Sequence, residues 1–253
     1  MTKAEPTARP AYDRGDVAML QSRAPQAAAF ARQILDTVRP FMAAAPCTAI
    51  DIGCGYGHTA AELSRSCAQV VGIEPFDALA SHARELAREH PNLEIRHGSV
   101  YDLADVDTYD LAVLDNVLEH LPDQPAALAA IARALRPGGA LFLLVPNKLW
   151  PVEVHYHLPF LSYLPLSLAN RYLRIAGKGT DYTDASYAPT YWRLRRLLDA
   201  EPTLDYHFTL PSNLSLAAGG NALHYKLGAA ALRRFPALWA ISKALLVIAV
   251  KHG

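Results

Sequence analysis

Cysteine is scarce in this sequence, and the signals of export and of membrane insertion are missing. The three cysteines, Cys47, Cys54 and Cys67, are too few and too irregularly spaced for a disulfide framework or a zinc knuckle. The N-terminal MTKAEPTARP has no apolar stretch of the kind that secretion signals carry. No run approaches the roughly 20 apolar residues that span a bilayer. These absences predict a cytoplasmic protein with reduced thiols, and membrane contact, if there is any, is expected to be peripheral.

The sequence also lacks an excess of charge of either sign. Lys plus Arg number 24 and Asp plus Glu number 24, so the formal net charge is zero. This balance argues against a broad phosphate-neutralising surface, so a small molecule is the expected partner and nucleic acid is not. The 253 residues, 51% of them hydrophobic, suffice for one domain with a sizeable core. A homo-oligomer is left open.

The order of the apolar runs predicts buried strands that alternate with helices. Helical spacing predicts a helix between residues 17 and 42, after a loose tail at 1–15. Strands are predicted at 48–52, 69–73, 93–97, 110–114 and 140–145, and helices at 59–66, 77–89 and 124–135. A glycine cap at Gly138-Gly139 is expected to close the last of these helices. The alternation predicts a doubly wound, mostly parallel α/β sheet with helices on both faces.

The rhythm changes after Pro146. Residues 147–190, rich in Pro, Tyr, Leu and His, predict an insertion of loops and short helices. A helix at 191–198 and strands at 204–210 and 245–250 are expected to follow. Residues 223–238 predict a helix that is apolar with interspersed basic residues. Core packing or a dimer face is the favoured interpretation of this segment, and docking on a membrane surface is the alternative.

A glycine-rich turn follows the first core strand, in the run Ala49-Ile-Asp-Ile-Gly-Cys-Gly-Tyr-Gly57. Glycine allows a ligand to approach the backbone closely, and the carboxyl ends of parallel strands are where such sheets bind ligands. A nicotinamide dinucleotide fingerprint would need a third small residue at position 58, which is His58. Asp51, two residues before the first glycine, suits a cationic ammonium better than a pyrophosphate. The pattern therefore points to S-adenosylmethionine (SAM), and a nicotinamide oxidoreductase on the same fold is disfavoured.

A second acid, Glu74, ends the second predicted strand. It lies close to the roughly 20-residue offset at which an acid binds a ribose diol in folds of this kind. A carboxylate accepts from both hydroxyls at once. We therefore expect Glu74 to hold the ribose of the ligand.

Residues 49–146 resemble the cofactor half of class I SAM-dependent methyltransferases, especially the small-molecule group. Four motifs occur in the family's order: the glycine turn, Glu74, the run from Asp110 to Leu121, and the run from Leu135 to Leu143. The resemblance implies seven strands with the last antiparallel, a SAM-binding core at 40–146, an N-terminal tail and helix at 1–39, and an acceptor side at 147–253. It also implies SAM as cofactor and S-adenosylhomocysteine (SAH) as product.

The resemblance assigns residues to the cofactor. The implied set is Asp51, Gly53, Gly55, Gly57, Glu74, Pro75, Ser99, Val100, Asp115, Asn116 and Val117. One departure concerns adenine, because the family commonly has Gly-Asp where this chain has Gly98-Ser99. A serine hydroxyl is a weaker acceptor than a carboxylate, so the Val100 backbone or Asp102 is expected to contribute there.

Two histidines follow the fifth strand in the loop where an acceptor would meet the methyl group. A hydroxyl acceptor must lose its proton, and His155 or His157 is the candidate base. No third ligand at convincing spacing accompanies them, so no metal site is predicted. The pair Glu119-His120 is interpreted as a helix start with a packing role. The expected reaction is methylation of a sugar, lipid-linked or secondary-metabolite hydroxyl, with N- or C-methylation and a non-catalytic SAM-binding module as alternatives.

Overall fold

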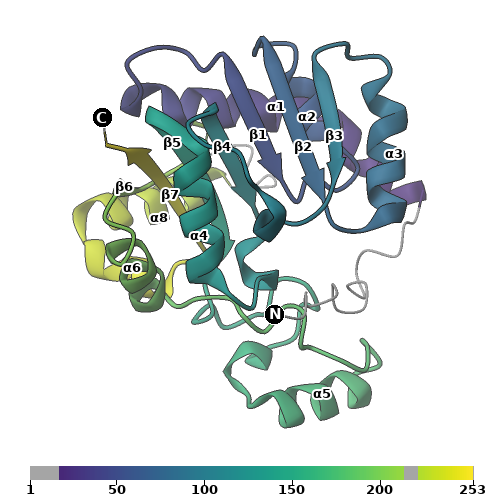
Figure 1. The fold of residues 1–253 in the computed structure, drawn as a ribbon. Coiled ribbons are helices and arrows are strands. Elements are labelled where there is room, and N and C mark those ends of the chain that lie inside the picture. Colours follow the sequence, from purple (N-terminus) through teal and green to yellow (C-terminus); the bar gives the residue numbers. More distant parts are fainter. Residues whose placement is uncertain (1–16, 214–221, 253) are drawn as a thin grey trace.

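Seven strands form one sheet in the computed structural model, which describes residues 17–213 and 222–252. The strand order across the sheet is β3-β2-β1-β4-β5-β7-β6 (Figure 1). The strands are β1 (Thr48–Ile52), β2 (Gln69–Glu74), β3 (Leu93–His97), β4 (Tyr109–Asp115), β5 (Leu135–Pro146), β6 (Leu204–Thr209) and β7 (Ala244–Lys251). The first five run parallel to their neighbours, and β7 runs antiparallel to both β5 and β6. The prediction of a mostly parallel sheet with an antiparallel last strand is confirmed.

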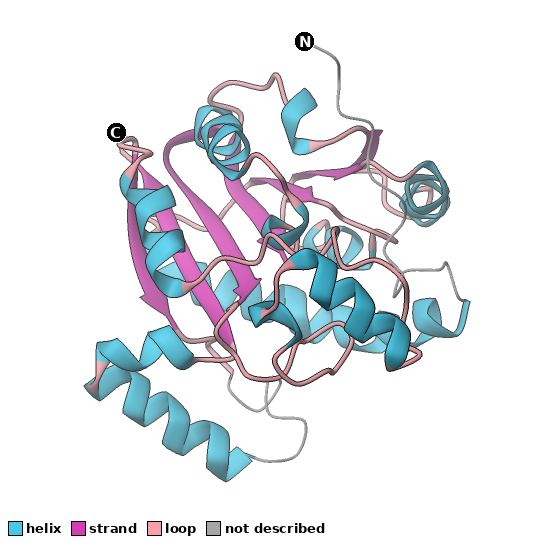
Figure 2. Ribbon diagram, turned by 90° about the horizontal axis from the view of Figure 1, so that it is seen from below, coloured by secondary structure: helices cyan, strands magenta, loops and turns pink. Residues whose placement is uncertain are grey.

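Helices cover both faces of this sheet (Figure 2). On one face lie α1 (Val17–Val38), α2 (His58–Leu63) and α3 (Asp77–Ala87), and on the other lie α4 (Gln124–Ala134) and α6 (Tyr191–Asp199). Short 3-10 helices connect them: η1 (Arg39–Phe41), η2 (Val100–Asp102), η3 (Leu118–His120), η4 (Leu161–Tyr163) and η5 (Pro236–Ile241). The remaining helices in residues 17–213 and 222–252 are α5 (Leu166–Ile175) and α8 (Ala222–Arg234).

The central strands are apolar on both faces because each face is covered. In β5, Phe142 packs toward α1 and α2, whereas its neighbours Leu141 and Leu143 pack toward α4 and α6. All three side chains are fully buried. Such two-sided burial produces the near-continuous apolar runs from which the strands were predicted.

Two element boundaries were predicted wrongly, each for a local reason. The glycines Gly138 and Gly139 lie inside β5 and do not cap α4, which ends at Ala134. The register slips between the Tyr109–Leu135 and Leu111–Ala140 pairs, and Gly138 at φ +78° provides the irregular turn of the bulge. The helix predicted at 223–238 instead ends at Arg234, because Pro236 lacks the amide proton to continue it. The predicted tail at 1–15 lies outside the described residues.

The insertion after β5 has a small apolar core of its own. Tyr156, Leu161, Leu173 and Tyr182 are buried together, and α5 closes this cluster. In Figure 1 the insertion lies beyond the edge of the sheet where β1 and β2 end, so it faces the carboxyl ends of the strands. Among the described helices, none is both long and apolar enough to span a membrane.

Candidate cofactor and acceptor site

The turn after β1 is fastened to the end of β2. The amides of Gly53 and Cys54 both donate to the carbonyl of Ile73, at 2.8 and 3.1 Å. The Gly55 amide donates to Glu74 Oε2 at 2.9 Å. The two predicted cofactor elements, the glycine turn and the acid, therefore form one hydrogen-bonded unit.

Glycine is required in this turn for space as much as for backbone conformation. Gly53 has φ +70°, and a Cβ there would lie 2.6 Å from Val117 Cγ2. Gly55 has φ +57°, and a Cβ there would meet no described atom within 4 Å. The turn thus presses against the β4 loop at Gly53 and leaves open space at Gly55. Since the amides of Gly53, Cys54 and Gly55 bond to β2, the turn serves a ligand by close approach and not by donating these amides.

Asp51 is a buried carboxylate with one oxygen that lacks a donor among the described residues. Its side chain is 4% exposed, and no hydrogen-bond partner for Oδ2 occurs in the part of the chain that the structure describes. Burial, and then the nearby charges of Asp115 and Glu74, raise the pKa of Asp51 to about 7. A cationic group placed here would compensate all three carboxylates. The site therefore fits the ammonium and the positive sulfur of SAM.

Glu74 is buried at the end of β2, where it holds the backbone with both oxygens. Oε1 accepts from the Phe76 amide at 3.0 Å, and Oε2 accepts from Gly55. A carboxylate offers about four acceptor directions. The carboxylate predicted to hold the ribose thus also fastens the glycine turn to the end of β2. Pro75 follows directly, and His97 Nε2 lies 2.9 Å from its carbonyl oxygen.

At the end of β3 the hydrogen bonds favour Asp102 over Ser99. Both the amide and the hydroxyl of Ser99 donate to Asp102 Oδ2, each at 3.0 Å. The Ser99 hydroxyl proton is therefore used within the chain, in a capping box that Ser99 and Asp102 form at the start of η2. The side chain of Val100 is buried in the main core, so this residue offers a ligand its backbone.

The loop after β4 carries the remaining cofactor candidates. Asn116 has φ +51° and its amide group donates to Asp115 Oδ1 at 2.8 Å. Val117 contacts the glycine turn at Gly53. Asp115, Asn116 and Val117 therefore lie at the same edge of the sheet as Asp51, and their contact with the cofactor stays a prediction.

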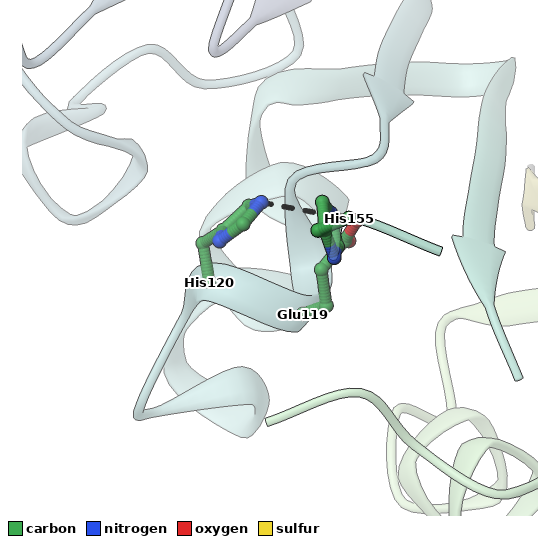
Figure 3. Close-up of side chains that lie close together, drawn as sticks. All are labelled: Glu119, His120 and His155. Carbon is green, nitrogen blue, oxygen red and sulfur yellow. Dashed lines mark ion pairs between the residues drawn. The ribbon is translucent and has the colours of Figure 1, made fainter. Parts of the chain in front are cut away.

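The structure separates the two candidate bases. The side chain of His155 is 11% exposed and lies beside Glu119, with 3.7 Å between His155 Nε2 and Glu119 Oε1. His157 is exposed, at φ +55°, and is not part of this cluster. The residue that joins His155 is His120, whose ring centroid is 5.3 Å from that of His155. Figure 3 shows Glu119, His120 and His155 turned toward one another.

The sequence interpretation missed this cluster because its members come from two different loops. Glu119 and His120 belong to η3 after β4, and His155 belongs to the loop after β5. Since β4 and β5 are adjacent and parallel, both loops leave the sheet at the same edge. The adjacency of β4 and β5 was the signal that could have indicated this cluster.

Burial and neighbouring charges raise the pKa values of two members of this cluster. Burial raises the pKa of Glu119, although the two histidines oppose the rise. Burial disfavours charge on His120, but its hydrogen bond to Asp184 and the charge of Glu119 outweigh this and raise its pKa. Polar groups of opposite charge are thus gathered in a largely buried place.

A separate cavity of about 360 Å³ opens at the same edge of the sheet, beyond the end of β6. Its walls combine apolar and aromatic side chains with a similar extent of polar surface. They include Tyr191, Phe208, Leu232 and Trp239, with Arg233 as the charged member. Of the other aromatic residues on the acceptor side, Tyr156 and Tyr182 are core, whereas Phe160, Tyr163 and Trp192 are exposed.

Comparison with known proteins agrees with this geometry. Residues 23–189 match the family described as "Methyltransferase domain". A ubiquinone biosynthesis O-methyltransferase of Xanthomonas oryzae pv. oryzae is 30% identical over 194 residues, 68% of this chain and 79% of that protein. A probable SAM-dependent methyltransferase of Mycolicibacterium smegmatis is 33% identical over 101 residues, 40% of this chain and 38% of that protein. The structure of the plantazolicin methyltransferase BpumL in complex with SAH shares the fold, with TM-score 0.60, 15% identity and coverage of 96% of this chain and 93% of that one.

Proposed function

The chain belongs to the methyltransferase domain family and depends on SAM, and from that premise we propose that it methylates a hydroxyl group of a small molecule. The observation that carries this proposal is the position of the cluster of Glu119, His120 and His155. It lies beyond the ends of β4 and β5, and its Glu119 and His120 belong to the same loop as Val117, which touches the glycine turn. A proton-accepting group is therefore close to the cofactor edge.

On the cofactor side, we assign three contacts. Asp51 receives the ammonium group, because its buried Oδ2 needs a donor. Glu74 receives the ribose hydroxyls while it holds the turn. Asp102 receives the adenine amino group in place of Ser99. Bound SAM supplies a methyl group on a positively charged sulfur.

On the acceptor side, the chain must position an oxygen in line with that methyl group and remove its proton. The oxygen–carbon bond forms as the carbon–sulfur bond breaks, and the electron pair of the broken bond stays on sulfur. The proton leaves to His155. Positioning and exclusion of water supply much of the rate in such a displacement.

The aromatic cavity beyond β6 supports an acceptor with an apolar body. Tyr191, Phe208 and Trp239 present ring faces, which suit a ring or an acyl chain. The ubiquinone biosynthesis O-methyltransferase similarity favours oxygen as the methylated atom. The balanced charge of the chain argues against nucleic acid as the acceptor. The proposed location is the cytoplasm.

The test is a search for product with labelled SAM. Purified protein is incubated with isotopically labelled SAM and, separately, a phenol, a catechol, a sugar, an amine and a carboxylic acid. Products are then identified by mass spectrometry. We expect label on a hydroxyl-bearing acceptor. Transfer to the amine or the carboxylic acid with none to a hydroxyl would overturn the O-methylation proposal. SAH binding by calorimetry without any transfer would favour the non-catalytic module.

A further inference from the structure

Glu119 is a buried carboxylate for which the described residues offer no hydrogen-bond donor. Its side chain is 0% exposed, and both oxygens lack a partner in the described part of the chain. The nearest cationic groups are His155 Nε2 at 3.7 Å and His120 Nε2 at 3.9 Å from Oε1. Both distances exceed a hydrogen bond. An ionised carboxylate in such a place is costly unless something else compensates it.

The two histidines are held by oxygen atoms of acidic residues on their far sides. His155 Nδ1 lies 2.7 Å from Glu153 Oε1. His120 Nδ1 lies 3.1 Å from both the backbone oxygen and Oδ2 of Asp184, and the hydrogen bond is to the backbone oxygen. Glu153 is itself fixed, because its Oε2 accepts from the amides of His155 and Tyr156. A carboxylate or carbonyl oxygen on one ring nitrogen sets the tautomer, in which the other nitrogen carries the electron pair that a metal ion binds. In both rings that other nitrogen is the one near Glu119 (Figure 3).

We propose that Glu119, His120 and His155 bind a divalent transition-metal ion, with zinc as the expected metal. One ligand atom from each residue lies within 4.8 Å of the others. Tetrahedral zinc with bonds of about 2.0–2.2 Å needs ligand separations of about 3.3 Å. The ion would thus draw the three side chains together by small rotations. Imidazole and carboxylate ligands with carboxylate-supported histidines are a donor set that zinc accepts.

The sequence prediction of no metal site considered His155 with His157. In the structure, Glu119 and His120 lie beside His155, and His157 does not. The three candidate ligands are therefore Glu119, His120 and His155. Three protein ligands leave a fourth position on zinc for another oxygen. Resting on the proposed function, we assign that position to the acceptor hydroxyl. Metal binding lowers the pKa of a bound hydroxyl, so its proton is lost to solvent before the oxygen attacks the methyl carbon.

The first test measures metal binding without activity. Protein freed of metal with a chelator is titrated with Zn²⁺ by calorimetry and with Co²⁺ by visible absorption. We expect one equivalent of each to bind and the Co²⁺ spectrum to be that of a four-coordinate site. Binding no tighter in the wild type than in Glu119→Gln or His155→Ala would overturn the proposal. The control is His252→Ala, which removes a half-exposed histidine at the end of β7.

Glu153→Gln and Asp184→Asn test the positioning residues. Each keeps the side-chain shape. Glu153→Gln should weaken Zn²⁺ binding by roughly 10- to 100-fold. Asp184→Asn should weaken it less, because the backbone oxygen of Asp184 still bonds to His120. A purely structural role would change thermal stability but not the metal affinity of the folded protein. Unchanged Zn²⁺ affinity in both variants would contradict the assigned geometry.

SAH calorimetry separates this inference from the proposed function. If SAH binds and the label is transferred, but neither metal binds, the metal site is wrong and the methyltransferase assignment stands. If metal binds and no hydroxyl is methylated, the site stands and the proposed acceptor chemistry fails.

Discussion

The two halves of the molecule hold their chemical groups in different ways. In the cofactor half, Asp51 and Glu74 lie at the ends of adjacent strands, and the turn between them is bonded to β2. In the acceptor half, His155 reaches its partners through a long loop, and Asp184 comes from a still later segment. The first arrangement is set by the sheet, and the second depends on how an insertion packs. A motif with fixed spacing can encode the first but not the second.

The two halves also differ in the charged groups that surround their buried carboxylates. Three carboxylates meet around Asp51, which is the place for a cationic ligand. Around Glu119 the carboxylate faces two imidazoles at distances too long for hydrogen bonds. We therefore expect substitutions in one half to change cofactor affinity and substitutions in the other half to change turnover.

The largest expected effect is on turnover. His155→Ala should lower kcat by about 10²- to 10⁴-fold, the usual contribution of a group that activates an acceptor oxygen. Affinity for SAH, measured by calorimetry, should stay the same. His157→Asn, which tolerates the positive φ, tests the other histidine. An equal loss of kcat in His157→Asn would place the acceptor on the exposed side of the loop. A loss of SAH affinity in His155→Ala would show that the acceptor half also contributes to cofactor binding.

The next effect is on cofactor affinity. Glu74→Gln should weaken SAH binding by about 10- to 150-fold, because charge-assisted bonds worth about 1.5–3 kcal/mol are replaced by weaker ones. Calorimetry measures the change, and thermal unfolding reports whether the turn has kept its place. An unchanged dissociation constant would remove Glu74 from the ribose.

A smaller effect is expected from pH. Because the pKa of Asp51 in the free protein is raised to about 7, a cationic ligand must displace a proton at lower pH. SAH affinity should therefore fall by up to about tenfold per unit as pH drops below 7. In the free protein, the protonated side chain of Asp51 stabilises the folded state at low pH. This contribution to the free energy of unfolding is lost as pH rises toward 7. Calorimetry in buffers of different ionisation enthalpy measures the released proton.

Asp51→Asn is the matched variant for that measurement. It cannot titrate, so the slope of SAH affinity against pH should flatten between pH 6 and about 7. A slope as steep as that of the wild type would assign the proton to another group.

The smallest expected effect concerns adenine. Asp102→Asn should weaken SAH binding by about 2- to 10-fold, the value of one hydrogen bond of 0.5–1.5 kcal/mol. Ser99→Ala removes the hydroxyl that Asp102 already holds and should change affinity less. The reverse order would restore Ser99 as the adenine contact.

The sequence was sufficient for the sheet because burial on two faces leaves a clear apolar pattern in each strand. It was also sufficient for Asp51 and Glu74, which lie next to strand ends. It failed at Leu135, where a helix passes directly into a strand and Gly138 forms a bulge. Glycine after a helix has two common explanations, a cap and a bulge, and only the register decides between them.

The cluster around Glu119 was not predictable from spacing. Its ligand candidates and their supporting carboxylates, Glu153 and Asp184, are brought together by the path of the insertion. The insertion has its own core around Tyr156 and Tyr182, and no short motif describes that packing. Strand adjacency could have suggested the pairing of the two loops, but not the approach of Asp184.

The position of β7 between β5 and β6 also bears on how the chain folds during synthesis. β6 emerges before β7 and joins the sheet through it, so β6 must wait for a later segment before its backbone is paired. Pairing across such sequence distances is slow, and in the interval the apolar edge of β5 is a template for aggregation. The yield of folded protein should therefore respond more to substitutions at Val247, which is fully buried in β7, than to similar substitutions at Val70 in β2.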